Sequence, residues 1–170
     1  MASLFGHGLV AYTITKVIDR KSVKVLLLLA IFSTIMPDAD VIAFKLGIAY
    51  EHPMGHRGFT HSILFAAIWA GILALWVGKK HKLVFFSVLF LSTVSHGLLD
   101  AMTNGGRGVG FFIPFNNQRF FLPWQPIEVS PIGIRDFFSK WGLNVIMSEM
   151  RFIVVPCAIV LITLALLKRR

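Results

Sequence analysis

The chain has 170 residues, of which 56% are hydrophobic and only 15% are charged. Its mean hydropathy of +0.74 is far above that of an ordinary soluble domain, which favours a single domain embedded in a membrane. The formal net charge of +9 would indicate a nucleic-acid partner in a soluble protein. Here the basic residues cluster beside apolar runs, as in cytoplasmic loops of membrane proteins, so we expect no nucleic-acid partner.

The N-terminus and the single cysteine add two expectations. The chain starts without a basic leader and small-residue cleavage site, so we expect no removable signal peptide and a mature protein that begins near Met1. Cys157 lies inside an apolar run, which makes it core filler and leaves no internal disulfide.

Five apolar stretches predict helices over residues 4–18, 25–36, 62–77, 83–100 and 151–167. Their apolar cores hold 11 to 17 residues, or about 16 to 25 Å, which is short of the ~30 Å hydrocarbon thickness. The runs are nonetheless apolar around their whole circumference, and basic residues that can snorkel flank their ends. We therefore predict an all-α, polytopic membrane bundle of about four to five helices; the alternative is a very apolar soluble bundle.

Two longer connections separate these helices, over residues 37–60 and 101–150. The second is unusual, because a connection of this length usually has a function or a structure of its own. It contains Trp124 and Trp141 among several phenylalanines. Amphipathic aromatic residues settle at membrane interfaces, so we predict a single domain over residues 1–170 with a long interfacial loop at 101–150.

The distribution of charge predicts the topology. If the helices alternate in direction, ten basic residues share one face with Asp19 as the only acid, and the other face has seven bases and seven acids. The ten are Lys16, Arg20, Lys21, Lys24, Lys79, Lys80, Lys82, Lys168, Arg169 and Arg170. The positive-inside rule then places these turns in the cytoplasm and the N-terminus outside.

Histidines and aspartates gather on the second face. Seven such residues lie at helix ends there: His7, Asp38, Asp40, His56, His61, His96 and Asp100. His96 and Asp100 are four residues apart, so on a helix they share a face. Imidazole nitrogen and carboxylate oxygen suit Zn²⁺, Mn²⁺ or Fe²⁺. The pattern predicts a site for one to three divalent ions, with zinc the first expectation, at one end of the bundle.

Each of these residues also has a plainer interpretation. His7, or His52 in the loop, can cap a helix, and the aspartates of Pro37-Asp38-Ala39-Asp40 can cap or end one. His96 and Asp100 can form a simple hydrogen-bonded pair. Seven imidazoles and carboxylates at one membrane depth are nonetheless costly unless they pair or bind metal, which favours the metal site.

The depth of the cluster follows from sequence spacing. His7, Asp38 and His96 are 13, 14 and 14 residues from Arg20, Lys24 and Lys82. That spacing places them ~20 Å from the cytoplasmic anchors, or ~10 Å below the opposite boundary of the hydrocarbon. A site at this depth favours a lipid or lipid-linked substrate.

Three motifs carry a family resemblance: the string from His56 to Ser62 (His-Arg-Gly-Phe-Thr-His-Ser), Pro37-Asp38-Ala39-Asp40, and the string from Ser95 to Asp100. With them the chain resembles the YdjM-type family of membrane-bound, predicted metal-dependent hydrolases, some of them under LexA control. The resemblance implies a metal-dependent hydrolase of the inner membrane. More remotely, the order of ligands is similar to zinc-dependent phospholipase C. The later His-x-x-x-Glu of that enzyme is absent, and Glu149 is the only nearby substitute.

These features predict hydrolysis of a lipid phosphoester or other ester by a metal-activated water, since a bound divalent ion lowers the pKa of water to near neutral pH. Asp40 or Glu149 is expected to take the proton, and His56 to act as ligand or acid/base. Arg57 and Arg119 are expected to clamp a phosphate, or else to anchor loops at the interface. The alternatives to an enzyme are a metal-binding transporter and a non-catalytic stress-response protein; the substrate and oligomeric state stay open.

Overall fold

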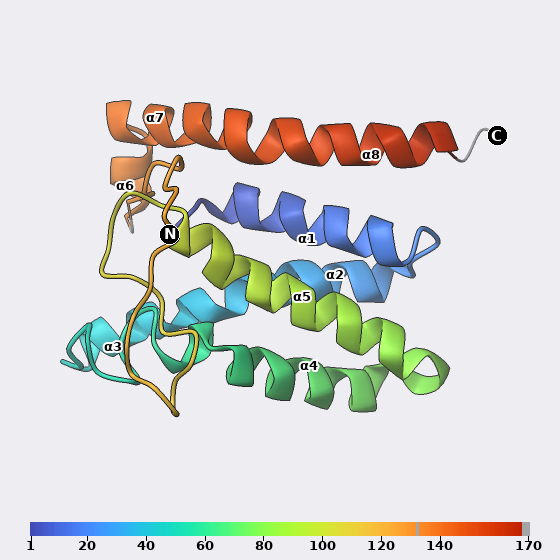
Figure 1. Ribbon diagram of the computed structural model, residues 1–170, viewed down its shortest axis with the longest axis horizontal. Helices are drawn as coiled ribbons and strands as arrows, with labels where there is room; N and C mark the ends of the chain where they lie inside the picture. Colours follow the sequence, from blue (N-terminus) through green and yellow to red (C-terminus); the bar gives the residue numbers. More distant parts are fainter. Residues whose placement is uncertain (132, 168–170) are drawn as a thin grey trace.

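The computed structural model describes residues 1–131 and 133–167, and it confirms the all-helical bundle (Figure 1). Four helices pack together: α1 (Leu4–Ile18), α2 (Lys24–Ile35), α4 (Ile63–Val77) and α5 (Lys82–Ala101). A fifth rod lies along α1 and consists of α7 (Lys140–Glu149), a π-helical turn (Met150–Val154) and α8 (Val155–Leu167). The first four helices begin and end within one residue of their predicted bounds.

The chain after α2 differs from the prediction of a loop at residue 37. It continues as a 3-10 helix, η1 (Met36–Val41), and a short helix, α3 (Ile42–Lys45). Pro37 lies in the first turn of η1, directly after α2; it has no N–H to continue the i→i−4 pattern, and the helix continues here in the 3-10 form. The apolar segment Lys24–Lys45 is therefore 22 residues long, which is sufficient to cross a membrane.

The start of the last helix was predicted wrongly, because α7 begins at Lys140 and not at Arg151. Ser139 caps it, with its Oγ accepting from the N–H of Trp141 at 3.1 Å. Polar residues interrupt the apolar run over residues 140–149, so that run did not indicate a helix there. One of them, Ser148, faces the preceding loop, where its Oγ accepts from the N–H of Glu128 at 3.0 Å. The predicted 101–150 loop thus ends near residue 139 and includes a short helix, α6 (Ile134–Phe137).

Three segments of the described chain are long and apolar enough to span a membrane: Lys24–Lys45, Lys79–Ala101 and Lys140–Leu167. Helices α1 and α4 are apolar but shorter. Alanines at the centre of the bundle are almost completely buried, including Ala11, Ala30 and Ala70. Small residues let helix backbones approach closely, which is how helices associate in membranes.

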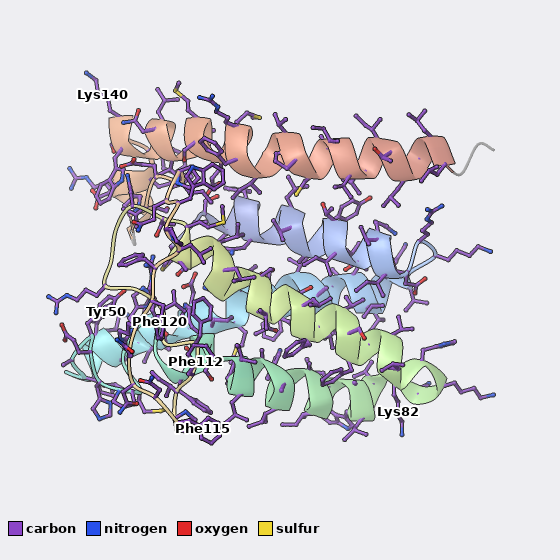
Figure 2. The ribbon with its side chains drawn as sticks, viewed as in Figure 1. Tyr50, Lys82, Phe112, Phe115, Phe120 and Lys140 are labelled. Carbon is purple, nitrogen blue, oxygen red and sulfur yellow. The ribbon has the colours of Figure 1, made fainter. Side chains whose placement is uncertain are left out.

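The two ends of the bundle differ in chemistry. The α1–α2 turn, the α4–α5 turn (η3, Lys79–His81) and the end of α8 lie at one end, and the loops and the start of α1 lie at the other (Figure 1). Figure 2 shows Lys82 at the first end and Tyr50, Phe112, Phe115 and Phe120 at the second. The basic residues 168–170 of the predicted topology lie outside the described residues.

Candidate metal centre

Four of the seven predicted ligands meet at the loop end of the bundle. Asp38 comes from η1, His61 from η2 (Phe59–His61), and His96 and Asp100 from α5. One ligand atom from each lies within 4.8 Å of the others, and all four residues are buried. Gly97 permits this approach, because a Cβ there would lie 3.3 Å from the carbonyl oxygen of His61.

Each of the two imidazoles is oriented by a contact to its Nδ1, on the side of the ring away from the cluster. His96 Nδ1 lies 2.6 Å from the carbonyl oxygen of Thr34, which only accepts, so this nitrogen carries the proton. His61 Nδ1 lies 3.1 Å from a carboxylate oxygen of Asp40. Both rings therefore turn Nε2 into the cluster. A carboxylate or carbonyl behind each histidine is the usual arrangement around a metal.

The cluster requires a positive charge at its centre. The Nε2 atoms of His61 and His96 lie 3.0 Å apart, so in neutral rings with Nδ1 protonated two lone pairs face each other. Burial disfavours a charged imidazole, but the nearby carboxylates of Asp100, Asp38 and Asp40 outweigh it and raise the pKa of His61 to about 10. Without metal, a proton on His61 separates the two nitrogens; a bound cation would replace that proton.

The distances fit one divalent ion. Asp38 Oδ1 lies 3.3 Å from His96 Nε2 and 3.8 Å from His61 Nε2, and Asp100 Oδ2 lies 3.7 Å from His61 Nε2. Tetrahedral ligands about 2.0 Å from an ion are about 3.3 Å apart, so small side-chain movements complete the site. Both oxygens of Asp38 are buried without a hydrogen-bond partner. A buried carboxylate without a hydrogen bond is costly, and a bound cation would offset that cost.

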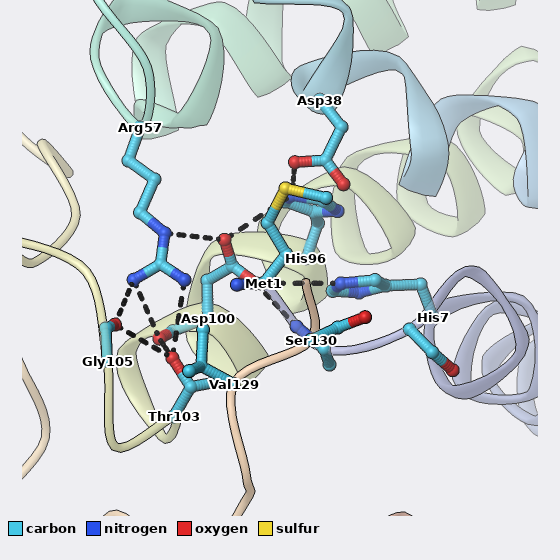
Figure 3. Close-up of polar contacts among 12 residues, drawn as sticks. Met1, His7, Asp38, Arg57, His96, Asp100, Thr103, Gly105, Val129 and Ser130 are labelled. Atoms are coloured by element: carbon cyan, nitrogen blue, oxygen red, sulfur yellow. Dashed lines mark hydrogen bonds and ion pairs between the residues drawn. The ribbon is translucent and has the colours of Figure 1, made fainter. Parts of the chain in front are cut away.

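Asp100, one of the four candidate ligands, is completely buried. Arg57 Nε lies 3.0 Å from its Oδ2, and the N–H of Ala2 donates to its Oδ1 at 3.1 Å. The amino group of Met1 lies 3.9 Å from the same Oδ1. Figure 3 shows Asp100 between Arg57 on one side and His7 and His96 on the other. Asp100 is thus held in place by groups other than the proposed ligands.

The other three predicted ligands surround this group. Asp40 Oδ1 lies 2.6 Å from His56 Nδ1, so Asp40 contacts both His56 and His61. His7 stacks on His96 with ring centroids 4.0 Å apart, and its Nε2 lies 3.6 Å from Asp100 Oδ1. Neither ring nitrogen of His7 has a hydrogen-bond partner. Asp40 and His56 therefore support the four-residue group, and His7 is near enough to extend it.

The two arginines predicted as phosphate clamps, or else as loop anchors, both have protein partners. Besides Asp100, the guanidinium of Arg57 donates to the carbonyl of Gly105 at 2.9 Å and to Thr103 Oγ1 at 3.3 Å. Gly106 packs against it, since a Cβ there would lie 2.6 Å from Arg57 Nη1. Arg119 donates to the carbonyl oxygens of Tyr50 at 2.7 Å and His56 at 2.8 Å. Both arginines hold loop backbone around the site.

Glu149, predicted as a base, lies outside the four-residue group. Its carboxylate is buried and accepts from the N–H and the hydroxyl of Ser3 at the start of α1. It therefore joins α7 to α1. Gly6 permits the approach, because a Cβ there would lie 3.1 Å from the Glu149 carboxylate.

Two residues of the site were missed from the sequence. Thr60 donates its hydroxyl to Asp40 Oδ2 at 2.8 Å. It lies inside the His56–Ser62 string, so its place between the two histidines could have indicated a role in the site. Thr34 contributes its backbone carbonyl to His96. A backbone contact of this kind has no residue-type signature.

Two neighbouring cavities adjoin the centre and share Met1 and Ser130 in their walls. The first has a volume of about 390 Å³ and is lined by His56, Arg57 and Tyr50, among others. The second, of about 440 Å³, reaches Asp38 and is otherwise lined mainly by apolar side chains. Of the four candidate ligands, Asp38 lines the second cavity, so the buried group adjoins an open space.

The fold and the site define a helical membrane protein with a buried Asp/His group that can hold a metal ion. Residues 1–170 match the YdjM inner membrane protein family, and the chain belongs to that family. Inner membrane protein YbcI of Escherichia coli (strain K12) is 37% identical to it over 161 residues, or 92% of each chain. No solved structure matches the chain.

Proposed function

We propose that the protein is a metal-dependent hydrolase of the inner membrane that cleaves an ester or phosphoester bond of a lipid or lipid-linked substrate. The observation that carries this proposal is the position of Asp38. It belongs to the four-residue group, its oxygens have no hydrogen-bond partner, and it lines a cavity. A catalytic metal site keeps a position for water or substrate beyond its protein ligands, and we expect that position on the cavity side of Asp38, as a fifth position or in place of one carboxylate oxygen.

Two nitrogens and two carboxylate oxygens favour Zn²⁺, with Mn²⁺ or Fe²⁺ as alternatives. Asp38, His61, His96 and Asp100 would hold one ion, and His7 is placed to help hold another. A bound ion would supply Lewis acidity, lowering the pKa of water and polarising the scissile group. The metal identity and the number of ions are part of the proposal.

His56 is the residue best placed to move a proton. Its Nδ1 is fixed by Asp40 at 2.6 Å, and its side chain lines the more polar cavity. A carboxylate behind an imidazole fixes its orientation and tautomer, which suits a general acid or base. Asp40 is then a positioning residue for His56 and His61, while Arg57 and Arg119 position the surrounding loops.

The proposed orientation in the membrane follows the charge distribution. The basic α1–α2 and α4–α5 turns would lie in the cytoplasm, and the metal centre on the non-cytoplasmic side. Multiple crossings by α1, α2, α4, α5 and the α7–α8 rod would produce this arrangement.

The test measures metal content and hydrolysis on the same purified protein. We expect stoichiometric metal and turnover of at least one class in a panel of phospholipids and soluble phosphoesters in mixed micelles. His96→Ala should lose both metal and turnover, whereas Ser95→Ala, its buried neighbour, should keep both. His56→Gln should keep the metal and lose turnover by about 10²- to 10⁴-fold. Bound metal without turnover on any class would overturn the enzyme assignment and favour a structural metal or a transporter.

A further inference from the structure

The cavity that reaches Asp38 has a hydrocarbon-like lining. Its volume of about 440 Å³ is within the ~300–1,000 Å³ range of small-molecule sites. The walls come from the start of α1, from η1 and from α6, and include Leu4, Phe5, Val41, Phe137 and Phe138. The lining therefore suits an apolar chain.

One wall of this cavity is polar. Asp38 is only 8% exposed, and neither carboxylate oxygen has a hydrogen-bond partner. It is also one of the four proposed metal ligands. A ligand that fills this space would place an apolar part against the phenylalanines and a polar part beside the metal centre. That combination is the chemistry of an amphiphile.

Large apolar side chains in the cavity wall are also exposed at the protein surface. Phe5 is 77% exposed and Phe138 is 85% exposed, and both line the cavity. In a membrane protein, such side chains are stable against lipid and costly against water. The position of these phenylalanines favours entry from the lipid phase.

We propose that this cavity binds an acyl chain of a membrane glycerophospholipid and places its ester or phosphoester linkage beside Asp38. The part of this inference that concerns cleavage of the linkage rests on the proposed function. Binding of the chain itself requires no turnover, so the two are tested separately.

The experiment uses the full chain in vesicles of phosphatidylethanolamine and phosphatidylglycerol. A trace of phosphatidylcholine carries a photoactivatable diazirine near the end of its acyl chain. After irradiation, we expect adducts on Val41, Phe137 and Phe138 several-fold above those on Ile159 and Ile162, which are exposed on α8. Excess 16-carbon lysophospholipid should reduce labelling of the cavity and leave that of α8 unchanged.

Matched variants identify the site. Val41→Trp should lower labelling of α6 several-fold because it fills the cavity, whereas Ile42→Trp, at an exposed neighbour outside its walls, should not. His96→Ala should retain the labelling, which would separate chain binding from hydrolysis. Labelling of α6 no higher than that of α8, or insensitive to lysophospholipid in the unmodified protein, would overturn the inference. Cavity labelling without turnover on any lipid would overturn the proposed function alone.

Discussion

Asp38 and Asp40 are two residues apart and contact opposite nitrogens of His61. Asp38 Oδ1 lies 3.8 Å from Nε2, and Asp40 Oδ2 lies 3.1 Å from Nδ1. The 3-10 helix that carries them explains the difference. At about three residues per turn, positions two apart point in different directions. One aspartate therefore faces the four-residue group as a candidate ligand, and the other contacts His61 from the opposite side of its ring.

Substitution of Asp40 tests these separate roles. Asp40→Asn should lower metal affinity by about 10- to 100-fold, because an orienting carboxylate is lost while the four ligands remain. Asp38→Asn should lower it further, because a ligand is lost. Competition with a chromophoric chelator in detergent measures both affinities. Equal losses in the two variants would indicate that Asp40 itself binds the metal.

The pH dependence of metal binding tests the proton at His61. Its pKa is raised from the ordinary 6.5 to about 10 by the surrounding carboxylates, despite burial, so the metal-free ring is protonated at pH 7. That proton stabilises the metal-free fold below pH 6.5, and its contribution is lost as the pH rises through about 10. A metal requires neutral imidazole, so binding should release about one proton, and affinity should rise about tenfold per pH unit between pH 7 and 9.

Calorimetry in two buffers of different ionisation enthalpy measures the proton release. Equal binding enthalpies in the two buffers would contradict a protonated His61 in the metal-free protein. Asp40→Asn should reduce the number of protons released near pH 8, because one of the carboxylates that raise the pKa of His61 is lost.

At the scale of elements, the contact between α7 and the start of α1 explains the buried Glu149. The Ser3 N–H and hydroxyl both donate to its carboxylate, and the adjacent Ala2 N–H donates to Asp100. The segment before α1 thus connects the last helical rod to the metal centre on α5. This connection gives Glu149 a structural reason to be buried that does not involve catalysis.

Removal of this carboxylate should destabilise the fold and spare the metal. Glu149→Ala leaves two buried donors of Ser3 without a partner, at a cost of about 1–3 kcal/mol each. We expect a lower melting temperature in detergent with stoichiometric metal retained. Asn144→Ala, at an exposed position of the same helix, should change neither. Loss of metal from Glu149→Ala in protein that remains folded would place Glu149 in the metal centre.

At the scale of the whole molecule, apolar runs and composition predicted the features of the fold that depend on local sequence. The four central helices and the grouping of histidines at one end follow from apolar runs and from the positions of His61 and His96 beside them. The extension of the last helix to Lys140 was not predicted, because polar residues interrupt the apolar run there. Two of them, Ser148 and Glu149, have their partners outside the helix, in Glu128 and Ser3. The role of Asp40 also depended on a local geometry, the 3-10 helix, that residue types do not specify.

The difference between the two ends of the bundle leads to a prediction about topology. Asn116 lies in the loop at the site end and Lys80 in the opposite turn, and both are exposed. Asn116→Cys should react with a membrane-impermeant maleimide at the outer face of the inner membrane in spheroplasts. Lys80→Cys should react only after the membrane is permeabilised, because basic turns stay in the cytoplasm.

The unmodified chain is the control for this labelling, since Cys157 is only 8% exposed. The reverse pattern would place the metal centre on the cytoplasmic side. The substrate would then come from the inner leaflet, while the apolar cavity and the four ligands would keep their proposed roles. Topology would thus decide which leaflet supplies the proposed substrate, whereas the proposed chemistry of the centre depends on its candidate ligands.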